Sequence, residues 1–285
     1  YTKVYSIHEG NYNMNDLELD YNSAVEIAKD IWWVGHYLPG DPFQCHVYLL
    51  INGKNSVLID PGSRLTFAST LEKIESLIPF DDIRYFICHH QDPDITGALL
   101  LIDDMVTRKD AVILSHWRTI ALLKHYALKL PLKCVEEMNW KLDLGFHSLK
   151  FIFTPYLHFA GAFTTYDEST AVLFSSDIFG GFTEGFSLFV QDDQYFESIK
   201  LFHEHYMPSR EILRHSLNKF QKIDIKLIAP QHGSIIPEQF IKSIIEQLED
   251  LECGIFLNPE DDTDIFRLSK LKRLISGFFR TVLSK

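Results

Sequence analysis

The stretch HHQDPDITG, residues 89–97, gathers four potential metal ligands directly after the apolar run IRYFIC. His90, Asp92 and Asp94 alternate along the chain, and alternate residues of an extended segment face the same side. A neutral imidazole with two carboxylates forms a hard, oxygen-rich ligand set that suits iron or manganese as well as zinc. The spacing therefore predicts a metal site. A helix cap formed by Asp94 would leave His90 and Asp92 unexplained.

Three later loops each place one more potential ligand at or just past the end of an apolar strand pattern. His158 follows LKFIFTPYL, Asp177 ends TAVLFSSD, and His232 follows IKLIAPQ. In layered α/β folds, functional sites gather where strands end and loops begin. Each residue alone is equally explained as a core histidine or a turn aspartate, but four such strand ends together favour one shared site.

The elements that must position these residues can be read from the apolar runs. Strands are expected at DIWWVGHY, CHVYLLING, SVLIDPG, IRYFICHH, AVILSH, LKFIFTP, TAVLFSSD and IKLIAPQHG. Helical patterns are expected at RLTFASTLEKIESLI, ITGALLLIDDM, HWRTIALLKHYAL and SREILRHSLNKF. Strands dominate the first part and alternate with helices from about residue 65, which predicts sheets covered by helices, an α/β fold.

Composition narrows the class of function. The 285 residues carry a formal net charge of -12, which disfavours nucleic acid because phosphate binding draws on clustered Lys and Arg. The four cysteines, Cys45, Cys88, Cys134 and Cys253, are widely spaced and predict neither disulfides nor a zinc knuckle. No apolar stretch reaches the ~20 residues of a membrane span, and the start has no signal-peptide pattern. A cytoplasmic location is therefore expected, with membrane association unlikely.

The last residues differ in character from the rest, and the expected division is a metal-binding domain at 1–253 and a tail at 254–285. Apolar residues recur at helical spacing in the tail, at Leu268, Leu271, Ile275, Phe278 and Val282. The tail is interpreted as a helix docked on the domain or on a second copy, so that a homodimer is possible. A connector to a further output domain and a membrane-surface helix are the alternatives.

The ordered motifs resemble the metallo-β-lactamase superfamily, and within it the diiron branch of flavodiiron proteins and related oxygen-binding diiron proteins. Hydrolases of that superfamily carry H-x-H-x-D-H, whereas the diiron branch carries H-x-E-x-D-H. This chain has His90-Gln91-Asp92-Pro93-Asp94-Ile95, with Asp92 at the carboxylate position. IWWVGHY and SVLIDPG are similar to the family's first strands, so the resemblance covers roughly residues 25–240. It implies an αββα sandwich with metal ions at one edge, between two mixed sheets.

The resemblance also implies roles for the six residues. His90, Asp92 and His158 would bind a first iron, Asp94 and His232 a second, and Asp177 would bridge both. Three aspartates would offset most of the positive charge of two Fe(II) ions.

Two departures from the family pattern affect the expected chemistry. Ile95 stands where the family has a further histidine, so the second iron would lose a ligand and keep an open position beside an apolar side chain, which suits a small apolar gas. His89 is expected to point to the other side and not to replace it. The pattern of a flavodoxin-like domain with an FMN site is also missing after residue 240, so electrons would come from a separate donor.

These features favour a non-haem diiron protein that binds dioxygen, as an oxygen sensor or carrier acting on a signalling partner. The first alternative is an oxygen or nitric oxide reductase with a separate electron donor. The second is a zinc hydrolase that uses a metal-bound hydroxide. Asp92, Ile95 and the acidic charge weigh against the hydrolase.

Overall fold

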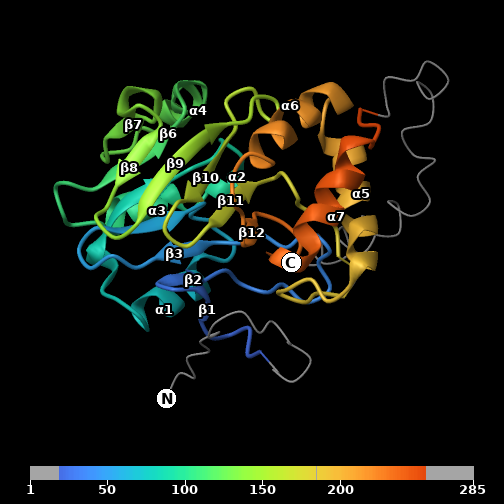
Figure 1. The fold of residues 1–285 in the computed structure, drawn as a ribbon. Helices are drawn as coiled ribbons and strands as arrows, with labels where there is room; N and C mark the ends of the chain where they lie inside the picture. Colours follow the sequence, from blue (N-terminus) through green and yellow to red (C-terminus); the bar gives the residue numbers. More distant parts are fainter. Residues whose placement is uncertain (1–18, 184, 255–285) are drawn as a thin grey trace.

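Two β-sheets lie face to face in the computed structural model, which describes residues 19–183 and 185–254 (Figure 1). The seven-stranded sheet has the order β1-β2-β3-β4-β5-β6-β7, with bounds Val25–Ala28, Ile31–Trp33, Tyr48–Leu50, Ser56–Ile59, Ile83–Ile87, Val112–Ser115 and Leu132–Cys134. The six-stranded sheet has the order β13-β12-β11-β10-β9-β8, with bounds Ile236–Pro237, Leu227–Pro230, Val172–Ser176, Phe163–Asp167, Ser148–Phe153 and Lys141–Asp143. Both sheets mix parallel and antiparallel pairs.

Helices cover the outer face of each sheet. The first sheet is accompanied by α1 (Phe67–Glu75), α2 (Pro93–Thr96), α3 (Leu99–Met105) and α4 (Trp117–Leu123). The second is accompanied by α5 (Phe196–Tyr206), α6 (Arg210–Phe220) and α7 (Glu238–Glu249), which lie together on one side of the molecule (Figure 1). Short 3₁₀ turns occupy Phe80–Asp82, Lys124–Tyr126, Glu136–Met138 and Asp193–Tyr195. The predicted αββα sandwich is confirmed.

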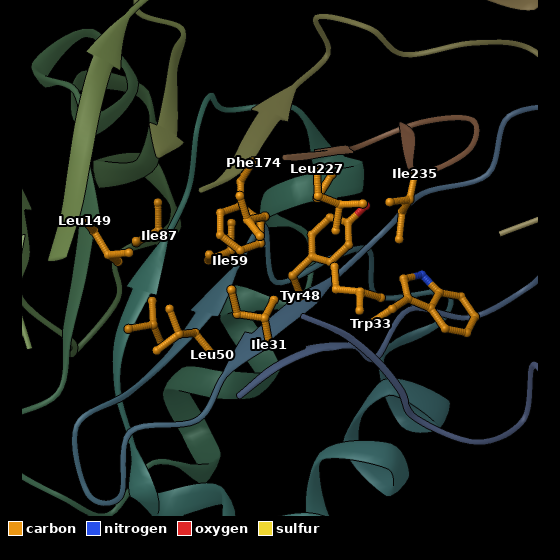
Figure 2. Packing of buried hydrophobic residues seen from close by; sticks show 14 of the residues in the cluster. Ile31, Trp33, Tyr48, Leu50, Ile59, Ile87, Leu149, Phe174, Leu227 and Ile235 are labelled. Carbon is orange, nitrogen blue, oxygen red and sulfur yellow. The ribbon is translucent and has the colours of Figure 1, made fainter. Parts of the chain in front are cut away.

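Three hydrophobic clusters match these layers. One lies between the sheets and includes Tyr48 and Leu50 of β3 and Phe174 of β11 (Figure 2). A second joins the first sheet to α1 and α3, and a third joins the second sheet to α5, α6 and α7. Strand β3 contributes to two of them, because Leu49, between Tyr48 and Leu50, faces the outer cluster. Side chains alternate along a strand, so a strand buried on both faces is apolar throughout.

One side chain joins the two sheets by a polar contact. The Tyr48 hydroxyl of β3 donates a hydrogen bond of 2.6 Å to the Pro230 carbonyl oxygen of β12, and both lie in the core. We expect Tyr48→Phe to lower the free energy of unfolding by about 1–2 kcal/mol, since the hydrogen bond is lost and a buried carbonyl loses a partner. Urea denaturation measures the change. Tyr156→Phe, at a side chain that is 51% exposed, is the control and should change stability little; equal effects of the two variants would contradict the prediction.

The helix expected over residues 95–105 is wrong in its bounds. It is two helices, and the break lies at Gly97 and Ala98, where the Ala98 N–H donates to the Gly62 carbonyl. A Cβ at Gly97 would lie 2.5 Å from the Pro93 carbonyl oxygen, so the close approach of the backbone leaves room only for glycine. The first of the two helices, α2, begins directly after Asp92 and contains Asp94.

The predicted tail lies outside the described residues from 255 onward, so the division at 253/254 stays a prediction. Among residues 19–183 and 185–254, no helix combines the length and the apolar character that a bilayer crossing requires.

Candidate metal centre

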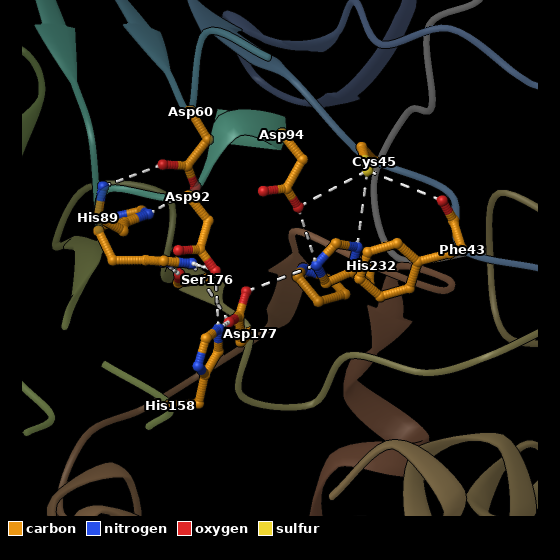
Figure 3. A network of polar contacts seen from close by, with 12 residues as sticks. Phe43, Cys45, Asp60, His89, Asp92, Asp94, His158, Ser176, Asp177 and His232 are labelled. Carbon is orange, nitrogen blue, oxygen red and sulfur yellow. Dashed lines mark hydrogen bonds and ion pairs between the residues drawn. The ribbon is translucent and has the colours of Figure 1, made fainter. Parts of the chain in front are cut away.

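The six predicted residues come together from four segments that follow strands, and Figure 3 shows Asp92, Asp94, His158, Asp177 and His232 gathered in one cluster. Strand β5 leads into His90, Asp92 and Asp94, and β9 leads towards His158. Strands β11 and β12 run parallel with Ser176 opposite Pro230, so the residues that follow them, Asp177 and His232, emerge side by side.

The first ligand group, His90, Asp92 and His158, surrounds one oxygen of Asp177. Asp177 Oδ2 lies 3.4 Å from His90 Nε2 and 3.0 Å from His158 Nε2. Asp92 Oδ2 lies 3.5 Å and 3.0 Å from the same two nitrogens. Ligand atoms bound at about 2.1 Å to one ion, roughly 90–110° apart, lie about 3.0–3.5 Å from each other. The spacing of this group therefore fits a single metal ion.

The second ligand group, Asp94 and His232, faces the other oxygen of Asp177. His232 Nε2 lies 3.4 Å from Asp94 Oδ2 and 3.6 Å from Asp177 Oδ1. Asp177 is 1% exposed, and its Oδ1 has no hydrogen-bond partner within residues 19–183 and 185–254. A buried carboxylate oxygen without a partner is costly unless a cation compensates it. The residues present thus fit two metal ions that share Asp177.

Hydrogen bonds behind the imidazole rings fix which nitrogen faces the centre. The His232 Nδ1–H donates to the Gln44 carbonyl oxygen at 2.9 Å, and His90 Nδ1 lies 3.1 Å from the Ser176 hydroxyl. In each ring Nε2 is left to point at the carboxylates. Such contacts orient metal-binding histidines and set their tautomer.

Electrostatics at the cluster favour positive charge. Burial alone would lower the pKa of His90, but the carboxylates of Asp177 and Asp92 outweigh it and raise this pKa to about 9. The same balance raises the pKa of His158 to about 10. Burial would raise the pKa of Asp177, yet His90 and His158 together lower it to about 2. Protons on the histidines supply here the charge that a metal cation would supply.

The cluster has an open and a closed side. The side chains of Asp92, His158 and Asp94 are 31%, 26% and 23% exposed. Those of His90 and Asp177 are each 1% exposed, and that of His232 is 3% exposed. The backbone at the closed side is unusual, because Ser176 has a left-handed φ of 55° where the pairing of β11 with β12 shifts register. This kink turns Asp177 out of the strand into the cluster.

A comparison with models of protein families identifies the family of this chain. The model of the family described as ODP family beta lactamase matches residues 43–233. The chain belongs to this family. The predicted resemblance to the metallo-β-lactamase superfamily and its flavodiiron-like branch is thereby confirmed.

Other members and neighbours of the ODP family share this core. A structure described as a peroxy diiron species of the chemotaxis sensor ODP has 26% sequence identity and a TM-score of 0.68, covering 79% of this chain and 91% of that chain. A flavodiiron protein from Giardia intestinalis shares the fold, with 22% identity and a TM-score of 0.70 over 81% of this chain and 60% of that chain. A nitric oxide reductase from Moorella thermoacetica is 28% identical over 235 residues, 75% of this chain. The chain spans 58% of that reductase and 59% of an uncharacterised protein from Methanocaldococcus jannaschii.

Two histidines of the ODP-family core have structural roles. His89 is fully buried, with Nδ1 2.7 Å from Asp60 Oδ2 and Nε2 2.8 Å from the Thr165 hydroxyl, so both ring nitrogens are occupied. His89 thus points away from the cluster of predicted ligands, as its place in the alternation predicts. His203 of α5 accepts a hydrogen bond from the Phe179 N–H and packs in the core.

Three further residues line the ODP-family site: the sequence did not indicate Phe43 or Cys45, and for Tyr206 it left pocket lining open beside core packing, which was the default. The Phe43 ring stacks on His232 with 3.9 Å between ring centroids, and the Tyr206 ring lies edge-on to His158 at 5.6 Å. The Cys45 sulfur contacts both members of the second ligand group. Burial, with the Asp94 carboxylate beside it, raises the pKa of the Cys45 thiol well above its ordinary value. Its place at the start of an expected strand was the only signal, and nothing in the sequence set it apart from the other cysteines.

Ile95 is fully buried and belongs to the outer hydrophobic cluster of the first sheet. It therefore contributes to the core that holds α2 in place, and it offers no ligand atom to the second group.

Proposed function

We propose that this chain is a non-haem diiron protein that binds dioxygen, as an oxygen sensor or carrier. The observation that carries the proposal is the placement of Asp177, whose two oxygens face the two ligand groups while one of them lacks a hydrogen-bond partner among the described residues. The proposed ligands are His90, Asp92 and His158 at the first ion, Asp94 and His232 at the second, and Asp177 between them. The similarity to the structure described as a peroxy diiron species of the chemotaxis sensor ODP supports iron as the metal at this site.

The charges of the site support this choice. Three carboxylates meet in a small, partly buried volume and would offset most of the charge of two divalent ions. A pair of redox-active ions supplies electrons to dioxygen and positions where it can bind. The side chains of Asp92, His158 and Asp94 are partly exposed, so the proposed entry point for the gas is at that face of the site. Phe43 and Tyr206 border the site with apolar ring surface that would keep bulk water away.

Metal analysis with optical spectroscopy tests the proposal. Protein purified without oxygen should contain about two iron ions per chain and gain a visible absorption band when air is admitted. Protein that takes up only zinc, or that shows no spectral change with two irons bound, would contradict it. The first outcome would favour the zinc hydrolase that the fold also permits, and a chromogenic thioester or lactam substrate then provides the direct assay.

An oxygen or nitric oxide reductase with a separate electron donor is the second candidate, because the chain is 28% identical to a nitric oxide reductase over most of its length. Turnover with a surrogate donor and a measured supply of oxygen or nitric oxide separates the two. Continuous consumption of oxygen or nitric oxide supports the reductase, whereas a single stoichiometric uptake supports a sensor or carrier.

Ser176→Ala should weaken iron binding at the first ligand group by about ten- to hundredfold, because the Ser176 hydroxyl orients His90 from behind. Competition with a chromogenic chelator measures the affinity. Ser175→Ala, at the neighbouring hydroxyl that bonds the Ile178 carbonyl instead, is the matched control. Equal affinities for the two variants would show that the contact to His90 does not matter.

A further inference from the structure

Cys45 lies against the second ligand group. Its Sγ is 3.8 Å from Asp94 Oδ2 and 3.8 Å from His232 Nδ1, and the three residues offer ligand atoms that all lie within 4.8 Å of one another. Figure 3 shows Cys45 on the same side of the cluster as Asp94 and His232, opposite His158. A sulfur at about 2.3 Å and an oxygen at about 2.1 Å from one tetrahedral ion are ~3.6 Å apart, close to the observed separation.

The segment that carries Cys45 is fixed in position. The His46 N–H donates to the Gln231 carbonyl at 2.8 Å, and the His232 Nδ1–H donates to the Gln44 carbonyl. His46 is itself held between the Trp33 indole N–H at 2.9 Å and the Gly233 carbonyl at 2.6 Å. Residues 44–46 are thus clamped to residues 231–233 on both sides of Cys45. These hydrogen bonds fix the backbone of Cys45 beside His232, and the thiol contacts that ring.

The second group lacks a ligand that Cys45 can supply. Within the described residues it consists of Asp94, His232 and one oxygen of Asp177, and Ile95 is buried in the outer core. The thiol donates a hydrogen bond to the Phe43 carbonyl at 3.7 Å, and its contacts with Asp94 and His232 hold the sulfur beside the second group. Cys134 and Cys253 lie outside both potential metal groups.

We propose that Cys45 Sγ is a protein ligand of the second metal ion, in the position that Ile95 leaves without a ligand. The inference rests on the proposed metal centre. On binding, the S–H bond breaks, the proton goes to solvent and a metal–sulfur bond forms, with no change in oxidation state. A thiolate adds a fourth negative charge to the site and makes the second ion softer and electronically distinct from the first.

Cobalt(II) reports such a bond without any activity assay. Protein titrated with cobalt should bind two equivalents, and a near-ultraviolet thiolate-to-cobalt charge-transfer band should grow with the equivalent that fills the second group. Cys45→Ser and Cys45→Ala should lose the band and weaken that equivalent at least tenfold, while the other equivalent is unchanged. Cys134→Ser is the matched control, because Cys134 is also partly buried but contacts Glu136 instead, and it should keep the band.

Alkylation provides an independent readout in the unmutated chain. Iodoacetamide labelling of Cys45, located by peptide mass spectrometry, should slow at least tenfold when two cobalt ions are bound, while labelling of Cys134 is unchanged. Two bound ions with neither the band nor protection would overturn the inference and leave the metal centre intact. Failure to bind two ions at all would overturn the metal centre together with it.

Discussion

Asp177→Asn is expected to remove both metal ions, taking the metal content from about two per chain to near zero after dialysis. The carboxylate is the only described side chain that reaches both ligand groups, with Oδ2 in the first and Oδ1 towards the second. An amide keeps the shape but removes the negative charge and replaces one ligand oxygen by an NH2 group that cannot bind a cation. Elemental analysis after anaerobic reconstitution gives the content, and circular dichroism verifies that the chain is folded.

Asp167→Asn is the matched control for that variant. Asp167 is also a buried aspartate of the second sheet, but it is paired with His147 at 2.8 Å and with the Thr170 hydroxyl at 2.6 Å. Its replacement should leave the metal content at about two. If Asp177→Asn retains both ions, the shared carboxylate is not a bridge and the proposed centre is wrong.

Metal loading should raise thermal stability by more than any of the single substitutions above lowers it. An ion that binds only the folded chain stabilises it by about 4 kcal/mol at a free concentration of 1,000 times its Kd, and two sites contribute separately. For a domain of this size, 1 kcal/mol moves Tm by roughly 2–4 °C, so each site should add about 8–16 °C. The stabilisation arises because the bound cations offset the negative charges of Asp92, Asp94 and Asp177, which lie close together.

Differential scanning calorimetry of chelator-treated and iron-loaded protein, kept anaerobic, measures this shift. Asp177→Asn should show almost no shift with metal, which separates site binding from a general salt effect. Equal Tm values for treated and loaded wild-type chains would contradict the expectation.

The sequence predicted β3, β4, β11 and β12 from their apolar runs, because burial on both faces leaves a clear pattern there. It missed β10, which reads FTTYD, although all five residues are buried. The polar atoms of that strand are satisfied internally, for instance by Thr165 with His89, so burial there has no hydrophobic signature. Strands β7, β8 and β13 read LKC, KLD and IP, and no continuous apolar run marks them as strands.

The candidate site likewise has residues that the sequence predicts and residues that only the structure shows. The six predicted residues follow strands, and the sites of layered α/β folds gather where strands end, so their convergence is predictable. Cys45, Phe43 and Tyr206 reach the cluster through the loop before β3 and through helix α5, whose placement across the sandwich depends on tertiary contacts. No local pattern encodes such contacts, so these residues emerge only from the structure.

The six side chains differ in exposure, so one side of the centre faces solvent and the opposite side is buried. The partly exposed side chains are those of Asp92, His158 and Asp94, whereas His90 and Asp177 are buried in the core. Tyr206 is 40% exposed, and its ring lies beside His158 on the solvent-facing side of the centre. We expect a contact that covers Tyr206 from outside to reduce access to His158 while leaving the six residues of the cluster in place.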